Sequence, residues 1–176
     1  MALDFGVLFR PKFTDRMTLG ANLANMGPKV AFIDASQADP LPMNLKLGMA
    51  YKLLESRHNK LTATIDFNKP MVVKKDSLGG YKSDSWYKAI FTSFTDKNAR
   101  SFKRVGTAIG FEYWYSDLIA LRFGHFYEGF TGGRKFWTFG GGIRYSIYGF
   151  DFGYIAANKE GSPLADTMRF SLSFKF

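Results

Sequence analysis

Cysteine is absent from the 176 residues of this chain, and histidine occurs only twice, as His58 and His125. Without cysteine the chain can form no disulfide, thiol nucleophile or thiolate metal site. Neither histidine has neighbours at metal-ligand spacing. A hydrolase built on Ser and His needs both on one strand face, and His125 falls on the apolar side of its strand. We therefore expect no catalytic residue, cofactor or metal ion, and a protein that is not an enzyme.

Long apolar runs are also missing. A membrane helix needs roughly 18 uninterrupted apolar residues, no window of the chain contains them, and the mean hydropathy is −0.15. Insertion as a membrane helix is therefore excluded. A transmembrane β-strand remains allowed, because it needs only about ten residues of alternating pattern.

What the chain does contain is clearest at its end. Residues Met168–Phe176 alternate apolar and polar side chains and finish on phenylalanine. Successive side chains of a strand point to opposite faces, so this stretch has one apolar and one polar face. Terminal strands of outer membrane barrels commonly end in this way. The pattern predicts the outer membrane of a Gram-negative cell envelope.

Eight further segments show the same alternation, and aromatic residues make up 18% of the chain. The fold class we predict is all-β, an antiparallel transmembrane β-barrel in one domain. Its nine strands are expected at Leu3–Arg10, Met17–Ala24, Met43–Leu53, Lys60–Asn68, Val105–Tyr115, Leu118–Glu128, Phe136–Ser146, Phe150–Ala157 and Thr167–Phe176.

Every second residue of these strands is apolar or aromatic, and the residues between them are small or charged. The charges expected in the lumen are Glu112, Arg122, Glu128, Arg144, Asp151 and Arg169. We expect them to pair with one another across strands; alternatively they line a pathway. A soluble lipocalin-type barrel would reverse the two faces, and parity alone does not say which face is inside. Aromatic residues near the strand ends favour the membrane version.

The connections between the strands alternate in length. Counted back from the C-terminus, every longer loop falls on one side and every short turn on the other. Outer membrane barrels have short periplasmic turns and longer external loops. The external loops are therefore expected at Asn25–Pro42, Lys69–Arg104 and Gly129–Lys135, with a further loop at Asn158–Asp166.

Nine strands are an odd number, whereas bacterial single-chain barrels have an even one. An unpaired first strand would leave open backbone groups in lipid. The opening Met1–Phe5 leads into a strand with no signal peptide before it. We expect either that the chain is the C-terminal part of a larger barrel, or that one of the nine strands is wrong.

The longest external segment contains a helical pattern. Residues Ser83–Phe94 place apolar side chains at positions i, i+4 and i+8 behind a Ser/Asp cap, with two more aromatic residues beside them. The five side chains are Trp86, Tyr87, Ile90, Phe91 and Phe94. The helix either packs across the barrel mouth or is exposed and binds a partner.

The same external segment is basic. Between Met71 and Arg104 there are eight basic and three acidic residues, a surplus of five within the formal charge of +9. This charge either keeps a solvated loop soluble or contacts an anionic surface such as the phosphates of lipopolysaccharide. Nucleic acid is not an expected partner, because no recognition helix or stacking platform accompanies the charge.

Five segments in order resemble the PorV/PorQ family of type IX secretion outer membrane proteins, relatives of the FadL fatty-acid channels, and resemble its PorV members most. They are Leu19–Lys29, Leu41–Gly48, Trp86–Phe94, Gly132–Gly142 and Ser162–Leu172. The resemblance implies a FadL-like barrel of fourteen strands, of which these nine would be the C-terminal ones.

The resemblance also implies the function. Such proteins capture cargo that carries the type IX C-terminal secretion domain as it leaves the translocon, and deliver it to a surface attachment complex with a sortase-like protease. On this interpretation the external helix would grip cargo or complex partners. Two alternatives stay open: a FadL-like channel for hydrophobic compounds, which needs a continuous apolar lumen, and a soluble β-barrel binding module, which would purify without detergent.

Overall fold

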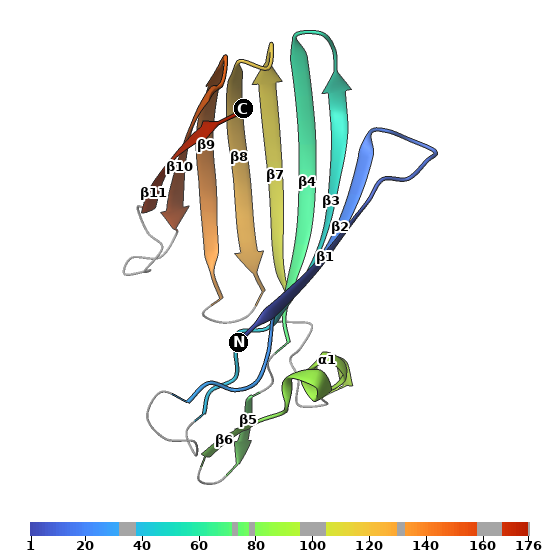
Figure 1. Ribbon diagram of the computed structural model, residues 1–176, viewed down its shortest axis with the longest axis vertical. Coiled ribbons are helices and arrows are strands. Elements are labelled where there is room, and N and C mark those ends of the chain that lie inside the picture. Colours follow the sequence, from blue (N-terminus) through green and yellow to red (C-terminus); the bar gives the residue numbers. More distant parts are fainter. Residues whose placement is uncertain are drawn as a thin grey trace.

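The structure is a computed structural model that describes residues 1–31, 38–71, 74–77, 80–95, 105–129, 133–157 and 167–175. One antiparallel sheet dominates it, with nine strands in the order β1-β2-β3-β4-β7-β8-β9-β10-β11 (Figure 1). The strands are β1 (Leu3–Phe9), β2 (Met17–Met26), β3 (Asn44–Glu55), β4 (Asn59–Pro70), β7 (Gly106–Tyr115), β8 (Ile119–Glu128), β9 (Lys135–Tyr145), β10 (Tyr148–Ala157) and β11 (Thr167–Phe174).

All nine predicted strands are confirmed, and their ends shift by only a few residues. Each strand pairs with its neighbours in chain order, as consecutive hairpins do. Among the described residues, β1 pairs only with β2 and β11 only with β10. The sheet is therefore open between β1 and β11 in this part of the chain, and the predicted closure into a barrel stays a prediction.

The register of the sheet places the apolar side chains on one face. Phe123 of β8 lies opposite Phe111 on one side and Phe139 on the other. Its ring is 5.4 Å from that of Phe139 and 5.2 Å from that of Trp137. These side chains are exposed although they are large and apolar, and Leu121 of the same face is 59% exposed. One whole face of the sheet therefore presents aromatic and aliphatic groups to the surroundings.

The short turns share one end of the sheet, the upper end in Figure 1, and we call this end the turn rim. It comprises residues 10–16, 52–60, 115–119, 145–148 and 175. Backbone hydrogen bonds join neighbouring turns: Lys52 N–H donates to Arg16 O at 2.9 Å, and Lys175 N–H to Ile147 O at 2.9 Å. Ser116 and Asp117 have φ values of 50° and 55°, which the tight β7–β8 turn requires.

The opposite end carries the longer loops and the remaining elements. These are the hairpin of β5 (Lys74–Ser77) and β6 (Gly80–Ser83) and the helix α1 (Trp86–Thr95), which lie below the sheet in Figure 1. The predicted helix is thereby confirmed, whereas the hairpin was not predicted. In the described ranges, no helix is long and apolar enough to cross a membrane.

Candidate functional site

A chain of ion pairs crosses four strands on the polar face of the sheet. Arg122 of β8 donates from Nε to Glu112 of β7 at 2.6 Å and from Nη1 to Asp151 of β10 at 2.8 Å. Arg144 of β9 donates from Nη2 to the other oxygen of Asp151 at 2.7 Å. Four of the six charges expected in the lumen are thus brought together, and each cation has an anion beside it.

Trp114 and a set of glycines hold this network against the sheet. The guanidinium carbons of Arg122 and Arg144 lie 5.6 Å and 5.4 Å from the centre of the Trp114 ring. A Cβ at Gly142 would lie 2.6 Å from Oδ1 of Asp151, so only glycine leaves room for that carboxylate. The arginines therefore lie along the wall, where their charges are paired.

The other two expected lumen charges lie apart from this network. Glu128 is buried and pairs instead with Arg134, whose Nη2 is 2.7 Å from Oε1 and whose backbone N–H donates to Oε2 at 2.8 Å. The side-chain hydrogen bond to Glu128 raises the pKa of the Arg134 guanidinium above its ordinary value. Arg169 of β11 forms no ion pair with another residue of the described ranges. Arg134 was not predicted, because it lies in a loop where alternation gives no signal.

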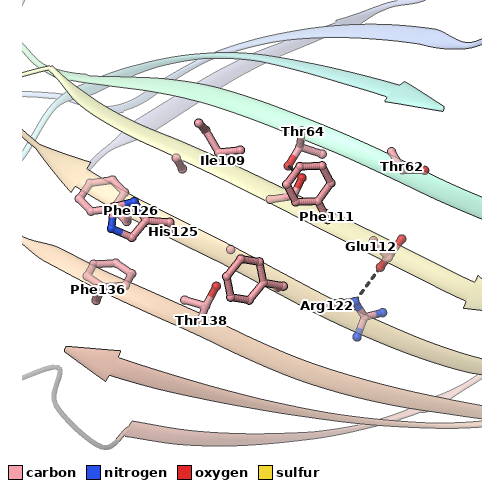
Figure 2. A pocket seen from close by; sticks show the side chains of 14 residues that line it. Thr62, Thr64, Ile109, Phe111, Glu112, Arg122, His125, Phe126, Phe136 and Thr138 are labelled. Atoms are coloured by element: carbon pink, nitrogen blue, oxygen red, sulfur yellow. Dashed lines mark hydrogen bonds and ion pairs between the residues drawn. The ribbon is translucent and has the colours of Figure 1, made fainter. Parts of the chain in front are cut away.

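A hollow of about 420 Å³ lies on the polar face between the network and the loop end. Figure 2 shows its wall: Thr62, Thr64 and Thr138 contribute hydroxyls, and the Glu112–Arg122 pair closes one end. At the other end the rings of Phe126 and Phe136 stack, with centres 5.0 Å apart. In the sequence, these two phenylalanines alternate in step with the charged residues of their strands, and this pattern already indicated that they lie on the polar face. The hollow is therefore amphipathic rather than continuously apolar.

The helix α1 is fixed to the loop end of the sheet through its small side chains. Ala89 is buried against Met43 and Met71, and Ile90 packs at the edge of this cluster. Ser93 is buried and donates from Oγ toward the sulfur of Met71 at 3.5 Å. The carbonyl of Ser85 accepts the N–H of Ala89 at 2.9 Å, as an N-cap residue does.

The larger side chains of α1 point away from this cluster. The exposed fractions are 41% for Trp86, 52% for Tyr87, 76% for Phe91 and 44% for Phe94, while Ile90 is half-buried. The helix therefore contacts the sheet mainly through Ala89, Ile90 and Ser93, and only Ile90 of the predicted stripe packs against the cluster. The small side chains of the helix are therefore packed against the loop end, and its aromatic side chains are exposed.

The two histidines lie apart from the charge network, and His125 is among the residues that line the hollow (Figure 2). The ring of His125 contacts that of Trp137 on the apolar face, with centres 4.1 Å apart, and His58 lies in the β3–β4 turn. Within the part of the chain that the structure describes, no group of three or more metal-ligating side chains is present. Part of the predicted basic loop, residues 72–73, 78–79 and 96–104, lies outside the described residues.

Part of the chain matches a known protein family. Residues 7–76, which run from β1 through β4 into β5, match the family described as "Type IX secretion system protein PorV". The matched range contains two of the five segments on which the resemblance rests, Leu19–Lys29 and Leu41–Gly48. The predicted resemblance to this family is thereby confirmed over the matched residues. No curated protein matches the chain.

Proposed function

Because residues 7–76 match the PorV family of type IX secretion system proteins, we propose that the chain is an outer membrane component of that system. In this role it binds secreted cargo through the conserved C-terminal signal domain and delivers it to the surface attachment complex. It acts as a carrier and catalyses no reaction.

The exposed apolar face of the sheet is the observation that supports a membrane location. Apolar side chains cover this face on strand after strand, whereas the hollows and ion pairs lie on the other face. Soluble proteins rarely expose contiguous apolar surface of this extent. A transmembrane barrel of the FadL type, with lipid outside and the charged network in its lumen, accounts for both faces.

The exposed aromatic side chains of α1 form the proposed binding surface for protein partners. Trp86, Tyr87, Phe91 and Phe94 stand on a helix that Met43, Met71 and Ala89 hold in place. Aromatic residues presented on a rigid support supply much of the energy at protein interfaces. Their partners would be the cargo C-terminal domain, the secretion translocon and the sortase-like attachment protease, with lipopolysaccharide beside them in the outer leaflet.

Capture of cargo by a Trp86→Ala/Phe91→Ala variant tests this proposal. Loss of two interface aromatics is expected to lower recovery of proteins with the type IX C-terminal domain by about tenfold or more. A Tyr51→Ala/Tyr145→Ala variant removes two exposed aromatic rings near the turn ends of β3 and β9 and is the matched control, expected to retain capture. Equal recovery by both variants, with normal barrel assembly, would contradict the role of α1.

The amphipathic hollow supports a second candidate, a FadL-like transporter of hydrophobic compounds. The stacked Phe126 and Phe136 provide an apolar wall inside an otherwise polar lumen. A transporter would retain fatty acid or a similar compound on extraction, and Gly110→Leu, which fills the hollow, would release it. The Thr hydroxyls and the Glu112–Arg122 pair along the same wall favour the carrier over this alternative.

A further inference from the structure

The turn rim carries more basic than acidic side chains. The basic residues are Arg10, Lys12, Arg16, Lys52, Arg57, Lys60 and Lys175, and the acidic ones are Asp15, Glu55 and Asp117. Seven basic minus three acidic residues leaves a surplus of four. This rim is distinct from the basic external loop, because it lies at the opposite end of the strands (Figure 1).

Two of the three acidic residues already have partners of their own. Lys52 binds Glu55 at 2.9 Å, and Lys60 binds Asp117 at 2.6 Å. Arg10, Lys12, Arg16, Arg57 and Lys175 remain, and none of them forms an ion pair with another described residue. Asp15 is the only carboxylate left among them, so the unpaired charge of the rim is strongly positive.

A belt of tyrosines lies next to this charge on the apolar face. Tyr51, Tyr115, Tyr145 and Tyr148 stand at the turn ends of their strands, and all four are exposed. Tyrosine is enriched where a membrane's hydrocarbon meets its headgroups, since the ring is apolar and the hydroxyl is polar. Strands β7, β8 and β10 have 10 residues each, the length that spans the hydrocarbon when a strand is tilted.

The order along the strands is therefore an apolar band, then tyrosines, then unpaired Lys and Arg. Phe13, 81% exposed, stands among the basic residues of the first turn. We propose that the turn rim binds the anionic headgroups of phospholipids in the adjacent leaflet. This inference rests on the proposed membrane location. The positive charges are spread over the turn end of the sheet from the first turn to Lys175, which matches a sheet of lipid phosphates better than a single acidic protein segment.

The test compares phospholipids held by the full-length protein after extraction from vesicles of equal phosphatidylglycerol and phosphatidylcholine. Native mass spectrometry counts the lipids of each type that stay bound. We expect the unmodified protein to retain several phosphatidylglycerol molecules. The variant Lys12→Gln/Arg16→Gln/Arg57→Gln should lower the preference of the protein for phosphatidylglycerol over phosphatidylcholine about tenfold or more, because each basic group at an anionic surface contributes to the affinity. The matched control, Lys29→Gln/Lys88→Gln/Lys135→Gln, removes the same charge at the loop end and is expected to keep the preference.

Three results would overturn the proposal. They are equal retention of both lipids by the unmodified protein, an equal loss in both triple variants, and binding of soluble polyglutamate without any lipid preference. Heat-modifiable migration on gels reports membrane assembly separately in each sample. If the protein assembles but shows no lipid preference, only the proposed lipid binding by the turn rim is contradicted. If it fails to assemble in any vesicle, the proposed membrane location itself is contradicted.

Discussion

The ammonium group of Lys69 donates a hydrogen bond to the carbonyl oxygen of Ser93 at 3.0 Å, and so joins the end of strand β4 to helix α1. Lys69 is buried, with 7% of its surface exposed, and its Nζ lies 4.9 Å from the centre of the Phe94 ring. A buried cation is costly unless it is hydrogen-bonded. The helix that carries the proposed aromatic binding surface is thus held by a charged contact as well as by apolar packing.

The variant Lys69→Met tests this contact, because it keeps most of the aliphatic stem and removes the donor. Loss of a hydrogen bond to a charged group is expected to cost about 1.5–3 kcal/mol locally. Amide hydrogen exchange in residues 86–95 should accelerate, while the nine-stranded sheet keeps its protection. Lys88→Met, on the exposed side of the same helix, is the control. Unchanged exchange in Lys69→Met would show that Met43 and Met71 hold α1 without the lysine.

The Glu128–Arg134 pair braces the connection from β8 to β9 in a similar way. The Glu128 carboxylate accepts both the guanidinium and the backbone N–H of Arg134. Glu128→Gln keeps the size and removes the charge, so we expect a loss of about 1–3 kcal/mol in the stability of this connection. Faster proteolysis between residues 128 and 135 would report it. Arg169→Gln, a charged residue of the same polar parity with no ion pair in the described ranges, should leave cleavage unchanged.

The nine strands could be predicted because alternation with period two repeats in every one of them. The sequence predicted that the lumen charges pair across strands, and Glu112 with Arg122 is one such pair. The register of that pair could not be predicted, because a two-residue turn at Ser116-Asp117 would set Tyr115 against Leu118, whereas Tyr115 lies opposite Ile119. Loop length sets the register of a hairpin, and this connection has three residues between the paired Tyr115 and Ile119.

Three features could not be predicted, each for a physical reason. The hairpin of β5 and β6 has strands of four residues that are mostly polar, which show no apolar alternation. The contact face of α1 consists of small residues, Ala89 and Ser93, whereas the aromatic residues dominate the helical pattern. The partner of Glu128 is a loop residue, Arg134, and loop positions depend on long-range packing rather than on periodicity.

The charge network across β7 to β10 predicts non-additive effects. Arg122→Gln leaves the carboxylate of Glu112 without its cation and should destabilise the protein by about 1 kcal/mol, since the groups are partly exposed. Glu112→Gln/Arg122→Gln removes both charges and should cost less than the sum of the two single changes. The measurement is the temperature at which heat-modifiable migration is lost, compared around the full double-mutant cycle. Strict additivity would show that the pair contributes no coupling energy.

The two faces of the sheet predict opposite responses to a new charge. Ile109 is 47% exposed on the apolar face of β7, and Thr64 lies on the polar face of the adjacent β4, near the same level of the sheet. If the apolar face meets lipid, Ile109→Arg should cost about 2–4 kcal/mol, because an arginine near the membrane centre loses its hydration. Thr64→Arg adds the same side chain to the polar lumen and should cost little. Both free-energy losses can be measured from the fraction of protein assembled in phosphatidylcholine vesicles as a function of urea concentration. Equal losses, or a larger loss for Thr64→Arg, would contradict lipid on the apolar side.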